Sequence, residues 1–161
     1  MDTRMLTRRL FGQVGSLLLL CLSLVPVVQA MPAIQHWVTD NGVRVYFVPA
    51  PELPMLDVTV TFAAGSVRDG AHPGLANMTS TLLDMGAAGL TADEIATRIE
   101  SLGANLGTAA AREMATVSLR SLSDRAHLDP ALVIFADVIN RPNFDVKDFE
   151  REQQRKLVGI R

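Results

Sequence analysis

Hydrophobic and polar residues alternate strictly along residues 56–62. Leu56, Val58, Val60 and Phe62 fall on one face, and Asp57, Thr59 and Thr61 fall on the other. A period of two predicts a half-buried strand of an antiparallel sheet. The same reasoning predicts paired strands over residues 104–111 and 113–122, where Ala115, Val117 and Leu119 share one face.

A hairpin is predicted over residues 36–50. Asn41 and Gly42 separate two strand-like runs, and both positions of such a turn tolerate positive φ. Residues 31–36 before it are expected to form a short linker. Pro49, Pro51 and Pro54 predict an irregular connection to the next strand.

Four helices follow from apolar spacing and from their end signals. Pro73 is expected in the first turn of a helix that continues through Met78 and Leu83 to the glycines at 86 and 89. Thr91 and Glu94 form a T-x-x-E capping box for the second helix, which Gly103 ends. Residues 125–139 form the third, and Asp145 caps a fourth that is still running at Arg161.

The element order is β-β-β-α-α-β-β-α-α, which predicts an α+β fold, an antiparallel sheet with helices packed on it. The final helix has no stop signal, so we expect the chain to be shorter than its parent protein. The 131 residues after position 30 suit a single domain.

Residues 1–30 are expected to be a secretory signal peptide. Arg4, Arg8 and Arg9 precede a short apolar run, and Val28 and Ala30 fit a cleavage site after Ala30. Cleavage removes Cys21, the only cysteine, and with it disulfides, cysteine-bound metal and thiol nucleophiles. We therefore expect an exported protein of the bacterial periplasm with no membrane segment after cleavage; an uncleaved anchor is the alternative.

Charge argues against a nucleic-acid partner. The formal net charge is −2, and it becomes −4 without residues 1–30, which carry three arginines and one aspartate. Basic and acidic residues are mixed along the rest, with no basic run interleaved with aromatic residues.

Five segments in order resemble a known family. They are "DNGVRVYFV", "AAGSVRDG", "PGLA", "LTADEIATRIESLGANLG" and "VINRPNFDVKDFEREQQRKL". Together they resemble the N-terminal domain of the insulinase/pitrilysin family of zinc metallopeptidases, over roughly residues 36–161. The resemblance implies a domain like that of insulinase and the mitochondrial processing peptidase, over residues 31–161.

The resemblance also implies where a metal would be bound. In that family the helix after "PGLA" carries H-x-x-E-H, in which two histidines at i and i+4 bind zinc and the glutamate is the general base. A glutamate on a later helix is the third ligand. The corresponding positions here are Asn77, Ser80 and Thr81, with the third near Gly159. Amide and hydroxyl oxygens are poor zinc ligands, and Ser80 cannot replace a carboxylate base. We therefore expect no zinc, no other cofactor and no catalytic residue in this chain.

Other candidate groups have ordinary interpretations. His36, His72 and His127 are expected in a linker, a loop and a helix start, without metal-ligand spacing. Glu150 and Glu152 could be misaligned third ligands. The charged residues of the last helix otherwise indicate a solvated face: Lys147, Asp148, Glu150, Arg151, Glu152 and Arg155.

Three functions remain open on the sequence. The first is a non-catalytic subunit that partners a homologous zinc-bearing peptidase in a heterodimer and helps clamp an unstructured peptide. The second is an independent peptide-binding scaffold that adds a peptide to a sheet edge. The third is an active metallopeptidase with an unrecognised site.

Overall fold

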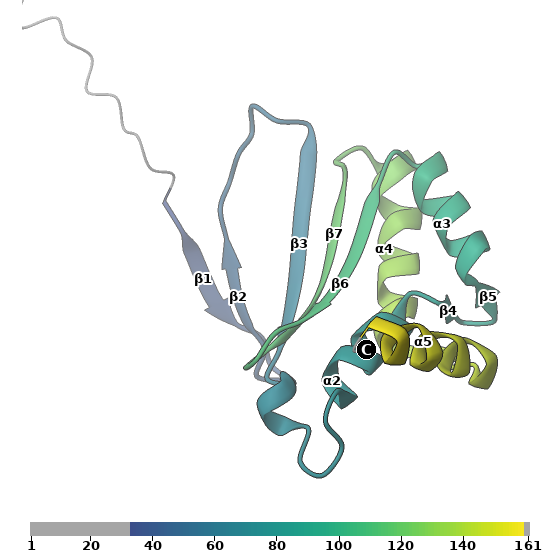
Figure 1. Ribbon diagram of the computed structural model, residues 1–161. Coiled ribbons are helices and arrows are strands. Elements are labelled where there is room, and N and C mark those ends of the chain that lie inside the picture. Colours follow the sequence, from purple (N-terminus) through teal and green to yellow (C-terminus); the bar gives the residue numbers. More distant parts are fainter. Residues whose placement is uncertain (1–32, 160–161) are drawn as a thin grey trace, which may run out of the picture. The chain divides into compact units, whose positions relative to one another are not determined.

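The computed structural model describes residues 33–159, which divide after Pro51 into two compact units (Figure 1). The predicted signal peptide and its cleavage site lie outside the described residues. Within residues 33–159, no helix is long and apolar enough to cross a membrane.

The first unit is the predicted hairpin. β1 (Gln35–Val38) pairs antiparallel with β2 (Arg44–Phe47). Gly42 adopts φ +84°, and its N–H donates to the Thr39 carbonyl at 2.8 Å, which closes the turn. The expected linker at 31–36 is wrong at its end, because residues 35 and 36 already belong to β1.

The second unit is built on a three-stranded antiparallel sheet in the order β3-β7-β6. The strands are β3 (Met55–Phe62), β6 (Asn105–Ala110) and β7 (Ala115–Leu122). Val117 and Leu119 on the central strand are 1% and 2% exposed, so the predicted inward face is confirmed there. Phe62 departs from the expectation and is 40% exposed, because it pairs with Ala115 at the end of the ladder.

Four α-helices belong to this unit: α2 (Leu75–Leu83), α3 (Ala92–Ser101), α4 (Arg125–Asn140) and α5 (Val146–Gly159). A short 3₁₀ helix, η1 (Ser66–Arg68), precedes α2. Two two-residue strands that the sequence did not predict, β4 (Gly86–Ala87) and β5 (Leu90–Thr91), lie between α2 and α3. The α+β fold class is confirmed.

Helix ends follow their local chemistry. The Thr91 hydroxyl accepts from the Glu94 N–H, and a Glu94 carboxylate oxygen accepts from the Thr91 N–H, so the capping box of α3 is confirmed. Pro73 is not in the first turn of α2, because Gly74 at φ +93° is the N-cap. The Asp69 carboxylate accepts instead from the N–H groups of Gly74 and Ala76, and so satisfies donors that the helix start leaves free.

The core of the second unit lies between its sheet and helices α3 and α4, which flank the same side of the sheet (Figure 1). It consists of buried aliphatic and aromatic residues: Ala87, Ile95, Ile99, Val117, Leu119, Ala131, Ile134, Phe135 and Val138. α2 packs beside the edge strand β6 and against α5, so these helices position the candidate site.

Candidate functional site

The three residues at the predicted metal-binding positions lie on two sides of α2. Asn77 is exposed and Thr81 is half-buried, while Ser80 is only 5% exposed. The i and i+4 spacing therefore does bring Asn77 and Thr81 onto one helix face, as the pattern predicts.

A side chain from α5 meets that face. The Lys156 ammonium donates to Asn77 Oδ1 at 2.5 Å and to Thr81 Oγ1 at 3.2 Å. Because an ammonium can only donate, the amide oxygen of Asn77 faces it. The Thr81 hydroxyl gives its own proton to the Asn77 carbonyl at 2.8 Å, which leaves Oγ1 as an acceptor. Asn77 Oδ1 and Thr81 Oγ1 thus both already accept a hydrogen bond from the Lys156 ammonium.

The predicted third position behaves differently. Gly159 is exposed at the end of α5, and a Cβ atom added there would meet no described atom within 4 Å. The residue of α5 that contacts Asn77 and Thr81 is Lys156, three positions earlier. Sequence reasoning missed Lys156, which the family pattern did not mark.

The expectation of a solvated charged face on α5 is wrong for Glu152, which is 2% exposed. Its carboxylate forms ion pairs with Arg155 and, at 3.7 Å, with Arg151, although Oε2 accepts no hydrogen bond of good geometry from a described residue. The Glu152 carboxylate is thus ion-paired with two arginines, while Glu150 is exposed.

The packed face of α5 is polar. Asp148, Glu152 and Lys156 are its less exposed residues and recur every four positions, whereas Phe149, Leu157 and Val158 are exposed. This spacing was visible in the sequence and places the three residues on one helix face, but it does not show that this face packs against the rest of the fold. Charged residues are usually exposed, and that rule favoured an orientation of α5 in which these residues face solvent.

The histidines occupy separate environments. His36 lies on β1, not in a linker, and its ring stacks with that of Tyr46 at 6.2 Å between centroids. His127 Nδ1 lies 2.8 Å from the carboxylate of Asp124, and this contact lowers the pKa of Asp124. His72 is an exposed loop residue. Among residues 33–159, no three His, Cys, Asp or Glu side chains are grouped to hold a metal ion.

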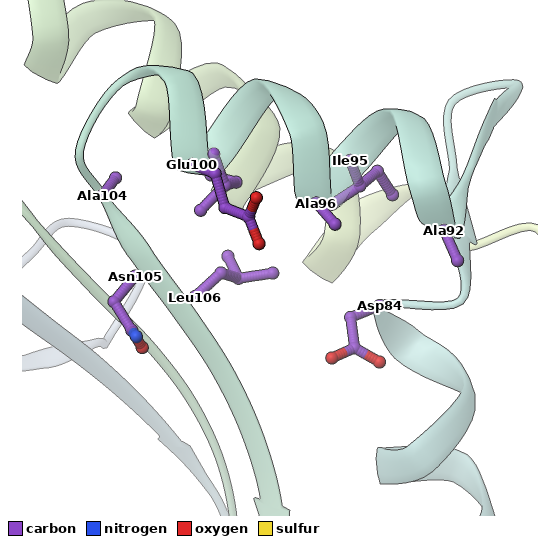
Figure 2. A pocket seen from close by; sticks show the side chains of 9 residues that line it. Asp84, Ala92, Ile95, Ala96, Glu100, Ala104, Asn105 and Leu106 are labelled. Carbon is purple, nitrogen blue, oxygen red and sulfur yellow. The ribbon is translucent and has the colours of Figure 1, made fainter.

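A pocket of about 200 Å³ lies between the end of α2, helix α3 and the start of β6. Figure 2 shows carboxylates of Asp84 and Glu100 beside an apolar floor that includes Ile95 and Leu106. Burial raises the pKa of Asp84, whose side chain is half-buried at the C-terminal end of α2. The polar side chains that line the pocket are two carboxylates and one amide, and no histidine, serine or cysteine lines it.

Comparison with known proteins gives one family. The sequence model described as insulinase (peptidase family M16) matches residues 45–159. A search of curated proteins gave no match.

Two solved structures are similar. The peptidase M16 inactive domain from Pseudomonas fluorescens is 43% identical in sequence, with a TM-score of 0.77 over 79% of this chain and 31% of that one. A protease from Helicobacter pylori is 22% identical, with a TM-score of 0.66 over 77% of this chain and 30% of that one, and it supports the fold alone. The chain therefore corresponds to less than a third of either protein.

Proposed function

Because the chain belongs to the insulinase family of peptidases (peptidase family M16) and is a homologue of an inactive domain of it, we propose that it acts as a non-catalytic subunit. In this role it partners a homologous, zinc-bearing peptidase and forms part of the wall that holds an unstructured peptide. The partner, the peptide and the periplasmic location are all parts of the proposal.

One observation carries the proposal: the helix face that would bind the metal is occupied by Lys156. The two oxygens at the ligand positions, Asn77 Oδ1 and Thr81 Oγ1, accept hydrogen bonds from its ammonium. No carboxylate occupies position 80, where the general base would lie, and Ser80 is buried. A zinc hydrolase needs about three ligands and a base, and this face supplies neither.

A peptide-holding role is supported by the edge of the sheet. β6 pairs with β7 on one side, and within the described residues no strand pairs with its other side. An extended peptide added there would gain backbone hydrogen bonds, and it would lie next to α2, which packs beside β6. The same edge favours the second candidate, a peptide-binding protein that needs no peptidase partner.

The decisive experiment is reconstitution. The chain is purified alone, together with a homologous subunit that has an intact H-x-x-E-H motif, and as a mixture of the two. The proposal expects a stable complex, with cleavage of an unstructured peptide enhanced in the mixture and absent from this chain alone. Stoichiometric zinc and peptide cleavage in the isolated chain would overturn it.

The two candidates differ in what the isolated chain does. A peptide-binding protein should bind a fluorescent extended peptide without a partner. The subunit proposal expects such binding to require the complex. Because β6 supplies the edge in both cases, a proline at Thr108, whose N–H points away from β7 in the β6–β7 register, should reduce binding in either assay.

A further inference from the structure

Across the α2–α5 contact, the Lys156 ammonium faces two neutral acceptors. Lys156 comes from α5, and Asn77 and Thr81 come from α2, 79 and 75 positions away along the chain. Among the described residues, no carboxylate lies within ion-pair distance of the Lys156 ammonium. The nearest acid on its own helix face, Glu152, is paired with Arg155 and Arg151 instead.

This arrangement does not fit a metal ion. A divalent cation between Asn77 and Thr81 would compete with an ammonium already bound to both oxygens, and the two positive charges would repel each other. The remaining ligands would be neutral amide and hydroxyl oxygens, which bind zinc weakly. The disagreement with the family's metal site is therefore one of charge as well as of missing ligands.

We infer that the Lys156 ammonium is an internal replacement for the metal: it ties α2 to α5 from the same helix face and excludes a divalent cation from it. The inference rests on the non-catalytic role proposed above, but it concerns only this chain. The charged donor strengthens both hydrogen bonds relative to neutral ones, and the partial burial of the Lys156–Thr81 bond limits competition from water there.

The first test compares the two lysines of the sequence, which lie on the same helix. Lys156→Met removes the ammonium and keeps a chain of similar length, so the melting temperature should fall by about 3 °C or more. Lys147→Met is the matched control at an exposed position and should leave the melting temperature within about 1 °C. Equal effects of the two substitutions would overturn the tethering role.

The second test measures zinc directly. Asn77→His with Thr81→His places two imidazoles at i and i+4, and zinc affinity is measured by competition with a chromophoric chelator. Adding Lys156→Met to this pair should tighten zinc binding by about tenfold or more, since it removes the competing cation. Adding Lys147→Met should not. The same affinity with and without Lys156 would refute the exclusion of a metal.

A third variant keeps the inference testable if the histidine pair does not fold. Asn77→Asp places a carboxylate against Lys156 and should raise the melting temperature in the wild-type background. In the Lys156→Met background the increase should be smaller, because only the helix-dipole contribution in the first turn of α2 remains, and this cycle isolates the contact. An equal change in both backgrounds would contradict the contact. None of these measurements uses a partner or a peptide. A failed reconstitution would therefore count against the proposed function without deciding the role of Lys156.

Discussion

At the scale of single residues, Gly65 is a position at which the packing of the backbone leaves room only for glycine. Gly65 is buried between η1 and the β6–β7 turn, and the N–H groups of Ser66 and Val67 bond to the backbone of that turn. A Cβ atom at Gly65 would lie 2.4 Å from backbone atoms of Glu113 and Met114. The φ angle of Gly65 is −82°, so contact and not backbone strain selects glycine.

Gly65→Ala should therefore destabilise the protein by about 1–3 kcal/mol, because rigid backbone atoms must move. Chemical denaturation monitored by circular dichroism measures the change. Gly70→Ala, where a Cβ would meet open space but φ is +57°, separates overlap from backbone strain. A smaller loss for Gly65→Ala than for Gly70→Ala would contradict the steric explanation.

Asp84 is a residue whose charge opposes folding. Burial raises its pKa, and its position at the C-terminal end of α2 adds an unfavourable interaction with the helix dipole. With a folded-state pKa above that of the unfolded chain, the protonated form favours folding. The stability cost is therefore absent below the unfolded pKa and grows as the pH rises through the folded one.

Asp84→Asn should consequently raise the melting temperature at pH 7, and the advantage should shrink as the pH falls toward 4. The comparison is a series of thermal melts across that range. Asp40→Asn, at an exposed turn residue, controls for the change in net charge. An advantage that grew on acidification would mean that the charged form of Asp84 is favoured in the fold.

At the scale of secondary-structure elements, local sequence signals define the helices, and tertiary packing decides which side chains of each helix meet. The capping box of α3 is an example of the first. Glu94 accepts from both the N–H and the hydroxyl of Thr91, and these hydrogen bonds lower the pKa of Glu94. α3 supplies Ile95 and Ile99 to the core, so its correct start matters beyond the cap itself.

Thr91→Ala should cost about 1 kcal/mol of folding stability, because the first turn loses its side-chain acceptor. Thr91→Ser keeps the hydroxyl and should cost much less. Urea denaturation of the three proteins gives the comparison. If serine and alanine were equally destabilising, the methyl group of Thr91 and not its hydroxyl would be responsible.

α2 and α5 show how tertiary packing decides which side chains meet, because Lys156 of α5 contacts two of the predicted metal-binding positions on α2. Replacing Asn77, Ser80 and Thr81 by His, Glu and His should not produce robust zinc-dependent peptide cleavage. The third ligand is missing, Lys156 still faces the site, and a carboxylate at the buried position 80 would lack a described partner.

Peptide hydrolysis with and without added zinc tests this variant. A second version with Gln at position 80 shows whether any activity depends on the carboxylate. Robust zinc-dependent cleavage by the first version alone would show that a nearby glutamate, Glu150 or Glu152, already serves as a ligand.

At the scale of the whole molecule, the second unit is held together by an apolar core and by ionic contacts between its own residues. The core between the sheet and helices α3 and α4 is apolar, and α5 is joined to α2 through Lys156. Arg120 and Asp57 form an exposed bidentate pair across β3 and β7, which lowers the pKa of Asp57. None of these contacts requires a bound metal.

The purified chain should therefore have the same melting temperature with and without a strong chelator, and it should refold fully in the chelator's presence. Elemental analysis should find far less than one zinc per chain. A large fall in melting temperature with the chelator, restored by zinc, would show that a metal stabilises this fold.

The sequence by itself determined several local elements. Residue alternation predicted β3 and β7, Asn41 and Gly42 predicted the hairpin, and Thr91 with Glu94 predicted the start of α3, because each signal acts over a few residues. It also determined the family, and the simultaneous change of Asn77, Ser80 and Thr81 was readable without a structure.

Only the tertiary structure decided what replaces the missing ligands. Periodicity shows which residues share a face of α2, but not which residue of α5, some 79 positions later, lies opposite that face. The burial of Glu152 and the contact at Gly65 depend on the same long-range packing. A charged residue has no sequence signature that distinguishes solvent from a buried ion pair, since both environments satisfy its charge, and the packing of α5 decides between them.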